Sequence, residues 1–465
     1  MKNTVELLRK DLKIHCTHGL FDSDQIDQRS KIIKNQIYNF FSGNTVKKNI
    51  YIYTNDLTII VPSIIAIWEL GASVVVHDYI PGWESHQAFK NFYSYIDLVL
   101  LSSDFIDKNE MTLPNLLLDL KSNNTLDLVV DIELDWPAAI THTSGTTRIP
   151  VPVKISHRDA ISLVKKNIEV FEFNQTDRIL HYKTLHHGSL FLNYAIPAMA
   201  VTNEHFFITM DPRSTPERFL DKALKFCQDS DITYWLIPYN WIRRIPALPT
   251  ESYNLSKLKL ITVMGPTTDE IQKIFDKTKV KEIFNNFGCT EVGSLFLSRT
   301  DKNNVGDYNP NRFYIVNNDV DLEFRPNYFK VKHKSCSDWN VIGDIFEIDS
   351  NDVYWWRGRC NIIDDENKYL QITEISKFLE EYFSNLDFSL VPDFELNKIY
   401  LAVFSKKINR SITDLQSDLN KKLFAITGST NTINKVSHFT DDFIVGMKPS
   451  QPLLLYSFRH NHENN

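Results

Sequence analysis

The apolar positions of the chain alternate between short strand-like runs and longer helix-like runs. Asn49–Tyr53 (NIYIY) is a short β-rich run, and Ile59–Leu70 has apolar residues at helical spacing. Ala72–His77 and Leu98–Leu101 then predict two more buried strands. This strand–helix–strand repetition predicts an α/β domain with layered, largely parallel sheets.

The middle of the chain continues this alternation. Leu258–Met264 predicts a buried strand that ends at Gly265–Pro266, and we expect Thr268 to cap the helix that follows. Lys281–Phe284 predicts a further strand, which we expect to lead into a loop over Asn285–Gly293.

The last part of the chain has a different character. Thr373–Phe383 and Ser411–Phe424 predict helices, and Ile399–Ser405 predicts a strand between them. These elements predict a small α+β unit. We therefore place a domain boundary near Cys360, which gives a large N-terminal domain of residues 1–360 and a small C-terminal domain of residues 361–465.

Composition narrows the class of protein. A chain of 465 residues, with 43% hydrophobic and 23% charged residues, predicts a globular protein of more than one domain. The formal net charge of −7 and the lack of a long basic run indicate no nucleic-acid partner. The 5 cysteines show no CxxC spacing, so we interpret them as reduced thiols of a cytoplasmic protein. Leu57–Val76 is interrupted by Pro62, Glu69 and Gly71, which argues against a membrane span.

A first candidate for chemistry is the turn Thr143, Ser144, Gly145, Thr146 and Thr147. Hydroxyls and exposed backbone N–H groups on such a turn suit phosphate oxygens, which accept several hydrogen bonds at close range. It is not a Walker loop, because no GK[ST] follows. A Thr/Ser/Gly turn with no binding role remains the alternative interpretation.

Two further candidates follow along the chain. The run Asn286–Glu291 contains an aromatic residue beside a glycine, and such a pair can flank a flat base. A Thr-Glu pair follows, which can bind a phosphate and its magnesium ion, because Mg²⁺ prefers oxygen ligands such as a carboxylate. Its alternative reading is a loop with a helix-capping threonine. Gly343–Asp344 and Gly358–Arg359 flank a predicted hairpin. A carboxylate can accept both hydroxyls of a ribose, and a guanidinium can hold a phosphate.

The order of these motifs resembles that of the adenylate-forming superfamily, which contains acyl- and aryl-CoA synthetases, adenylation domains of peptide synthetases, and luciferases. That family reads roughly T-S-G-T-T-G-x-P-K-G, then Y-G-x-T-E, then T-G-D, then G-R-x-D, then a C-terminal lysine. This chain reads THTSGTTRIPVPVKISH, FGCTE, IGD and GRCN in the same order. The resemblance implies a large N-terminal domain of layered α/β sheets and a small mobile α+β C-terminal domain.

The resemblance also implies a role for each matching residue. Thr143 to Thr147 would wrap the phosphates of ATP, and Gly265 and Pro266 would border the adenine. Asn286 would contact the adenine edge, while Phe287, with Gly288, would lie against the base. Thr290 would bind the α-phosphate, Glu291 would hold Mg²⁺, and Asp344 would bind the ribose hydroxyls. Arg359 would contact the ribose or phosphate, His187 would close the acyl pocket, and Lys448 would be the C-terminal catalytic lysine.

This sequence departs from the family pattern at several of these places. Arg148 and Ile149 stand where glycine and lysine are usual, and Asn361 stands where the family has a hinge aspartate. Met447 is an extra residue before Lys448, for which an exposed solvated lysine is the alternative. A histidine packed at a helix start is the alternative for His187.

The resemblance implies an ATP-dependent, AMP-forming ligase for a small carboxylic acid. Amino-acid-activating relatives usually carry an aspartate near the His187–Leu190 region, and this chain has none there, which favours a neutral fatty or aryl acid. The expected cofactors are ATP and Mg²⁺. The expected acceptor is a thiol, on coenzyme A or on the phosphopantetheine of an acyl carrier protein. The alternatives are a degenerate member that binds nucleotide or acyl ligand without catalysis, and an adenylating enzyme with an amine or protein acceptor.

Overall fold

The computed structural model describes two compact units of the chain. One unit contains Met1–Thr141, Pro152–Asn318 and Asp352–Tyr354, and the other contains His142–Val151, Asp319–Asn351 and Trp355–Asn465. Each unit has a hydrophobic core of its own. The described residues are 4–8, 11–16, 19–54, 56–76, 94–102, 113–142, 152–181, 191–208, 215–250, 252–263, 265–289, 292–325, 328–334, 339–342, 344–359, 375, 378–379, 382, 388–393, 398–403, 411–427, 432–438, 444–445, 448–449 and 458.

The first unit contains a 6-stranded sheet in the order β6-β5-β3-β4-β7-β8. Neighbouring strands from β6 to β7 run parallel. Helix α2 (Leu57–Glu69) is buried along most of its length, and helix α1 (Ser23–Phe40) begins with a capping box formed by Asp22 and Gln25. The strands are β3 Asn49–Tyr53, β4 Ser73–Val75, β5 Leu98–Leu101, β6 Asn115–Leu117, β7 Pro137–His142 and β8 Pro152–Ser156.

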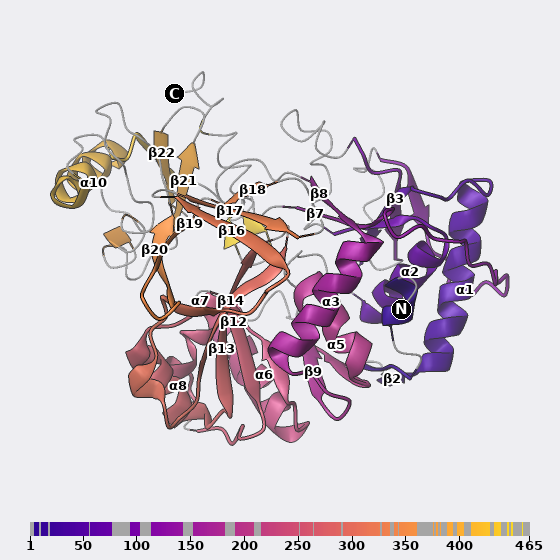
Figure 1. Ribbon diagram of the computed structural model, residues 1–465, viewed down its shortest axis with the longest axis horizontal. Coiled ribbons are helices and arrows are strands. Elements are labelled where there is room, and N and C mark those ends of the chain that lie inside the picture. The colour runs from indigo at the N-terminus through magenta and orange to yellow at the C-terminus, as the bar shows by residue number, and fades with distance from the viewer. Residues whose placement is uncertain are drawn as a thin grey trace. The chain divides into compact units, whose positions relative to one another are not determined.

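A second, larger sheet of this unit positions the candidate site (Figure 1). Its strand order is β15-β14-β13-β12-β11-β9-β10-β1-β2, with parallel pairing from β1 through β13 and antiparallel pairing at β2, β14 and β15. The strands are β1 Lys13–Cys16, β2 Gly19–Phe21, β9 Arg178–His181, β10 Glu204–Phe207, β11 Tyr234–Leu236, β12 Lys259–Val263, β13 Glu282–Cys289, β14 Gly293–Thr300 and β15 Arg312–Ile315.

Helices follow these strands as expected for an α/β layer. The Ser156 side chain caps helix α3 by accepting a hydrogen bond from the Asp159 amide. Short 3₁₀ turns, such as η5 (Val305–Asp307), lie between the longer elements. Among the described residues, the unit's further helices are the 3₁₀ helices η1 Thr4–Leu7 and η4 Ile245–Ala247, together with α3 His157–Phe171, the π-helix η3 Phe191–Ala195, α5 Ile196–Val201, α6 Pro216–Asp229, α7 Tyr239–Ile242 and α8 Thr268–Thr278.

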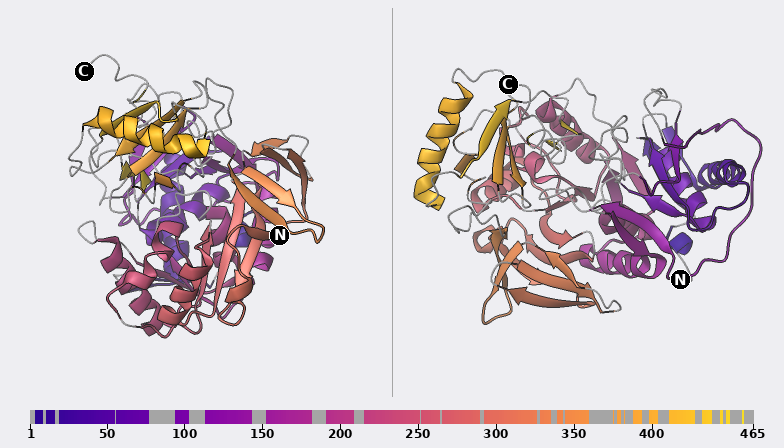
Figure 2. Two further views of the ribbon diagram at one scale, coloured as in Figure 1. Left: turned by 90° about the vertical axis from the view of Figure 1, so that its left-hand side faces the viewer. Right: turned by 90° about the horizontal axis from the view of Figure 1, so that it is seen from above.

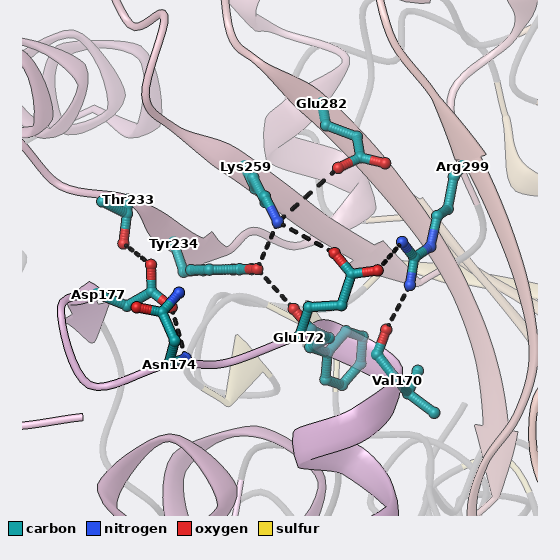
Figure 3. A network of polar contacts seen from close by, with 10 residues as sticks. Val170, Glu172, Asn174, Asp177, Thr233, Tyr234, Lys259, Glu282 and Arg299 are labelled. Atoms are coloured by element: carbon teal, nitrogen blue, oxygen red, sulfur yellow. Dashed lines mark hydrogen bonds and ion pairs between the residues drawn. The ribbon is translucent and has the colours of Figure 1, made fainter. Parts of the chain in front are cut away.

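A network of charged and polar side chains fastens the end of α3 to the amino edge of the larger sheet (Figure 3). Lys259 donates to the Tyr234 hydroxyl at 2.8 Å, and its Nζ lies 3.4 Å from the Glu172 carboxylate. Arg299 donates to the same carboxylate and, at 2.8 Å, to the carbonyl oxygen of Val170. The hydrogen bond from Arg299 lowers the pKa of Glu172. The network therefore fixes the C-terminal end of α3, the helix that follows β8.

The second unit contains an antiparallel sheet, a hairpin and a small C-terminal α+β part. The sheet consists of β16 (Val320–Arg325), β17 (Tyr328–His333) and β18 (Asn340–Ile342). In the C-terminal part, α10 (Ile412–Thr427) lies beside strands β21 and β22 (Figure 2). Leu415, Leu419 and Leu423 of this helix are buried against those strands, as their spacing predicts. The strands of this part are β21 Phe388–Asp393, β22 Lys398–Val403, β23 Lys435–His438, β24 Ile444–Val445 and β25 Lys448–Pro449.

The structure confirms the α/β class and corrects two local predictions. Thr267, not Thr268, caps α8, because its hydroxyl accepts from the Glu270 amide while the Glu270 carboxylate accepts from the Thr267 amide. The segment from Asn285 to Cys289 is a strand and not a loop, because it pairs residue by residue with β14. Among the described helices, none combines the length and the apolar character needed to cross a membrane. The boundary between residues 360 and 361 stays a prediction.

Candidate nucleotide site

The carboxyl ends of the parallel strands β9, β11, β12 and β13 meet at one edge of the larger sheet. In open α/β sheets this edge is where ligands bind. Gly265 and Pro266 lie just beyond the end of β12, and Asn286, Phe287 and Gly288 form the end of β13. The register pairs Val263 of β12 with Asn286 of β13, so the structure brings these predicted residues together.

Gly265 is held at this edge in a position that admits no side chain. Its amide donates to Asn285 Oδ1 at 2.7 Å, and Asn285 Nδ2 donates to the carbonyl oxygen of Pro310 at 2.9 Å. A Cβ at Gly265 would lie 2.1 Å from the Tyr308 hydroxyl oxygen and 2.8 Å from Asn285 Cγ. The loop after β12 is therefore tied to β13, and only its backbone is presented beside the Asn285 and Tyr308 side chains.

Asn286 has a carboxamide oxygen that is available for a ligand. The residue is 7% exposed, and among the described residues its Oδ1 has no hydrogen-bond partner. A buried acceptor left unpaired costs about 1–3 kcal/mol, and an N–H donor on a ligand would remove that cost. The exocyclic amino group of adenine is such a donor, so Asn286 fits a nucleotide at this edge.

Phe287 packs into an aromatic group on the opposite side of the strand from Asn286. Its ring centroid lies 6.0 Å from that of Phe296 and 6.1 Å from that of Phe313. Successive side chains of a strand point to opposite faces of the sheet. A base that contacts both Asn286 and Phe287 would therefore lie across the end of β13 and not against one face of it.

Gly288 allows the hairpin of β13 and β14 to close tightly. The register shifts between Phe287 and Gly288, and a Cβ at Gly288 would lie 2.3 Å from the carbonyl oxygen of Gly293. No side chain fits in that space, so glycine is required here for close approach of two backbones. The shift leaves Leu295 of β14 without a paired residue on β13.

In the second unit, a hairpin carries the two other predicted nucleotide contacts. Strands β19 (Asp344–Ile348) and β20 (Tyr354–Arg359) form the predicted hairpin. Asp344 is 2% exposed, and its Oδ1 accepts a hydrogen bond of 2.9 Å from Trp356 Nε1. Asp344 begins β19 and Arg359 ends β20, so the hairpin brings their backbones to the same end.

Several predicted site residues lie outside the described residues. They are Thr143, Ser144, Gly145, Thr146, Thr147, His187, Thr290 and Glu291. For Lys448 the structure gives the backbone, which begins β25 and lies opposite Val445 of β24. In sequence, the Thr143–Thr147 segment follows β7 directly, and Thr290 follows β13 directly. Their roles stay predictions.

Sequence reasoning missed two residues that shape this edge, Asn285 and Tyr308. The signal for Asn285 was available only if the strand had been predicted to continue to Cys289. The two-residue period of a strand would then have placed Asn285 on the same face as Phe287. Tyr308 is distant in sequence from Gly265, and no local pattern signals their contact. Burial raises the pKa of the Tyr308 hydroxyl, so this group stays protonated near neutral pH.

A buried pair of histidines lies at the carboxyl end of β9. His181 Nε2 is 3.1 Å from His205 Nδ1, and His205 Nε2 is 3.0 Å from the Thr202 hydroxyl. Burial lowers the pKa of both histidines, to about 4 for His205. Both imidazoles are therefore neutral near pH 7, and one can donate a hydrogen bond to the other. His181 is the last described residue before the segment that contains His187.

Comparison with known proteins adds to this geometry. A family model described as AMP-binding enzyme matches residues 62–327. A curated relative, the naringenin synthase of Pestalotiopsis fici, is 29% identical over 184 residues. That match covers 38% of this chain and 6% of the relative, so the chain spans only a small part of that protein's length.

Solved structures share the fold over almost the whole chain. The O-succinylbenzoate coenzyme A synthetase of Bacillus subtilis, solved with ATP and magnesium ion, is 14% identical with a TM-score of 0.71 over 94% of this chain and 96% of its own. The amide bond synthetase of Marinactinospora thermotolerans is 12% identical with a TM-score of 0.68 over 98% of both chains. At these identities the likeness shows the fold, and it confirms the fold class predicted from the sequence.

Proposed function

We propose that this chain, which belongs to the family of AMP-binding enzymes, uses ATP and Mg²⁺ to activate a small fatty or aryl acid as an acyl-adenylate. The proposal rests on the carboxyl ends of β12 and β13, which pair with each other in the larger sheet. There Gly265 leaves room only for backbone, and Asn286 Oδ1 is a buried acceptor with no hydrogen-bond partner in the part of the chain that the structure describes. These two features suit the flat, donor-bearing edge of adenine.

The reaction begins when a carboxylate oxygen of the acid attacks the α-phosphorus of ATP. The bond to the bridging oxygen breaks, pyrophosphate leaves, and a mixed anhydride of the acid and AMP forms. Catalysis of this step is mainly positioning and neutralisation of charge. Mg²⁺ would supply part of that neutralisation. In the proposal, Glu291 holds the ion, Thr290 donates to the α-phosphate, and the Lys448 ammonium offsets the developing negative charge.

The remaining residues bind the nucleotide and exclude water. Thr143 to Thr147 donate hydroxyl and amide hydrogens to the phosphates, and Arg359 adds a guanidinium. The Asp344 carboxylate accepts hydrogen bonds from the ribose hydroxyls. The hydrogen bond that it accepts from Trp356 Nε1 supports this role, because it fixes the orientation of the carboxylate. His187 closes the acyl pocket.

In the second step the acyl group passes to a thiol. The sulfur attacks the carbonyl carbon of the adenylate, the carbon–oxygen bond to AMP breaks, and a thioester forms. The thiol belongs to coenzyme A or to the phosphopantetheine of a carrier protein. The likeness of the fold to a coenzyme A synthetase supports a thiol acceptor.

An amine acceptor is the second candidate. The likeness of the fold to an amide bond synthetase favours it. Product analysis separates the two: incubation of the protein with ATP, an acid, coenzyme A and a panel of amines yields a thioester in one case and an amide in the other.

The proposal is tested by release of pyrophosphate from ATP and Mg²⁺, with hydroxylamine as a trap, against pooled fatty, aryl and amino acids. We expect release that depends on a fatty or aryl pool, together with the corresponding hydroxamate. Glu291→Gln should abolish most of that release while the protein stays folded. No release from any pool, in folded protein that still binds ATP, would support a family member that binds without catalysis.

A further inference from the structure

An aromatic stack fastens residue 458 to the small C-terminal part of the second unit. The Phe458 ring lies on the Tyr400 ring of β22, with the two centroids 4.8 Å apart and the two planes at 12°. Both side chains are buried, with Phe458 2% exposed. A buried pair of rings in this arrangement is a specific contact with a preferred geometry. Residue 458 is therefore held at one place on the sheet.

Tyr400 lies on the face of its sheet that is opposite α10. Its neighbours in β22, Ile399 and Leu401, belong to the core that α10 covers, and successive side chains of a strand point to opposite faces. Val391 of β21 pairs with Tyr400 and is also buried. Phe458 is thus part of what covers this second face, and removing its ring would uncover Tyr400.

The hairpin that carries Lys448 lies between two attachments to this one sheet. Strand β23 pairs with β22 and ends at His438. The chain then forms β24 and β25, whose register pairs Val445 with Lys448, and it next meets the sheet at the stack of Phe458 on Tyr400. Lys448 therefore belongs to a loop that is closed at both ends, and not to a free chain end.

The two ends of this loop lie close together. Tyr400 pairs with Lys435, and the rest of β23 carries the chain only about 10 Å further, to His438. Closing a loop removes most of the conformations that a free end samples, so a group on the loop has a higher effective concentration at one place. An ammonium that offsets charge at the α-phosphate gains from this restriction, because catalysis of that step depends on positioning.

The spacing around Lys448 agrees with a defined loop. Only Gly446 and Met447 separate Val445 from its partner Lys448, and two residues are the commonest length of a hairpin connection. Met447 is the residue that departs from the family pattern, in which the lysine follows the glycine directly. In this chain it completes the length of the hairpin and so puts Lys448 on the returning strand.

We propose that the stack of Phe458 on Tyr400 positions Lys448 for adenylate formation, by closing the loop on which that lysine lies. The inference rests on the proposed function and goes beyond it, because it assigns a positioning role to a residue that no motif marks. Phe458 acts only through Lys448 and touches no substrate. Its loss should therefore slow the first step without weakening the binding of ATP or of the acid.

The test measures hydroxylamine-trapped pyrophosphate release, with the acid that gives the most release in the pooled assay, for Phe458→Ala, Lys448→Ala and the double variant. We expect Phe458→Ala to lower kcat about tenfold and to leave the KM for ATP and for the acid within about twofold of the original values. The double variant should be no slower than Lys448→Ala, because Phe458 then has no lysine left to position.

Phe424→Ala is the matched control, because it makes the same change in the same part of the chain. Phe424 lies on α10 and is 51% exposed, so kcat should stay unchanged. Phe458→Tyr keeps a ring for the stack and should retain kcat, whereas Phe458→Leu keeps an apolar side chain without the ring and should lower it. This last pair replaces Phe458→Ala if that variant proves unstable.

A second measurement follows the loop without relying on activity. Amide hydrogen exchange of a peptide that covers Ile444–Pro449 should be faster in Phe458→Ala than in the original protein, because the closed loop becomes an open chain end. The same peptide should exchange at the original rate in Phe424→Ala.

The possible outcomes separate this inference from the proposed function. Additive losses in the double variant, or a lower midpoint of unfolding with unchanged kcat in Phe458→Ala, would overturn the inference, because the stack then only packs the unit. Full release from Lys448→Ala would overturn it together with the role of that lysine, and would leave adenylate formation standing. Absence of release from every acid, in folded protein of the original sequence, would contradict the proposed function and with it this inference.

Discussion

Gly265→Ala tests the close contact between the Gly265 backbone and the Tyr308 and Asn285 side chains in the candidate site. The new Cβ would lie 2.1 Å from the Tyr308 hydroxyl oxygen, 2.8 Å from Asn285 Cγ and 2.9 Å from Asn285 Nδ2. Tyr308 is buried, and Asn285 is held at both ends of its carboxamide by the Gly265 amide and the Pro310 carbonyl. Neither neighbour can move without losing packing or a hydrogen bond.

The magnitude follows from these two effects. Overpacking of a well-filled site costs about 1–3 kcal/mol. Loss of the hydrogen bond between the Gly265 amide and Asn285 adds about 0.5–1.5 kcal/mol. We therefore expect Gly265→Ala to lower the free energy of unfolding by roughly 2–4 kcal/mol, and to raise the KM for ATP by tenfold or more because the displaced loop borders the base.

The assay compares denaturant unfolding and ATP-dependent pyrophosphate release for Gly265→Ala and for Gly306→Ala. Gly306 is exposed in η5, and a Cβ built on it has no neighbour within 4 Å, so this control should change the free energy of unfolding by less than about 0.5 kcal/mol. Tyr308→Phe, which removes the nearest atom, should restore part of the loss when combined with Gly265→Ala. If Gly265→Ala behaves like Gly306→Ala in both measurements, the close approach has no energetic consequence and the reasoning is wrong.

Three further predictions follow from the other residues. Glu291→Gln should lower the rate of pyrophosphate release by two orders of magnitude or more with an unchanged circular dichroism spectrum, and near-normal release would exclude Glu291 as the magnesium ligand. Asp344→Asn should raise the KM for ATP more than it lowers kcat, and Trp356→Phe, which removes the 2.9 Å donor to that carboxylate, should have a smaller effect in the same direction in steady-state kinetics. Burial lowers the pKa of His157 from 6.5 to about 4, so as the pH falls the His157 imidazole is protonated in the unfolded chain before it is protonated in the folded one. The free energy of unfolding should therefore be highest above pH 6.5 and should fall by at most ~3 kcal/mol as the pH drops to about 4. Chemical unfolding across that pH range should show a shallower decline in His157→Gln, and an equal decline would place the proton elsewhere.

Local pattern determined much of the fold from the sequence alone. The run predicted as a strand at Asn49–Tyr53 has the same bounds in the structure, and the helix predicted over Ser411–Phe424 is observed as α10 (Ile412–Thr427). Each depends on residues only a few positions apart, whose side chains share one face or one helix end. The order of the motifs likewise indicated the AMP-binding family, to which a family model assigns residues 62–327.

Only the tertiary structure decided how the site is arranged. The run of Asn285, Asn286 and Gly288 reads locally as a loop, but pairing with β14 and the contact of Gly288 with Gly293 hold it as a strand. That pairing places Asn285 on the Gly265 loop and leaves Asn286 Oδ1 without a hydrogen-bond partner among the described residues. The contact of Tyr308 with Gly265 and the meeting of Asn167 with Asn193 likewise join residues far apart in the chain. A sequence records which groups are available, but the packing of distant elements determines which of them are satisfied and which remain free to bind.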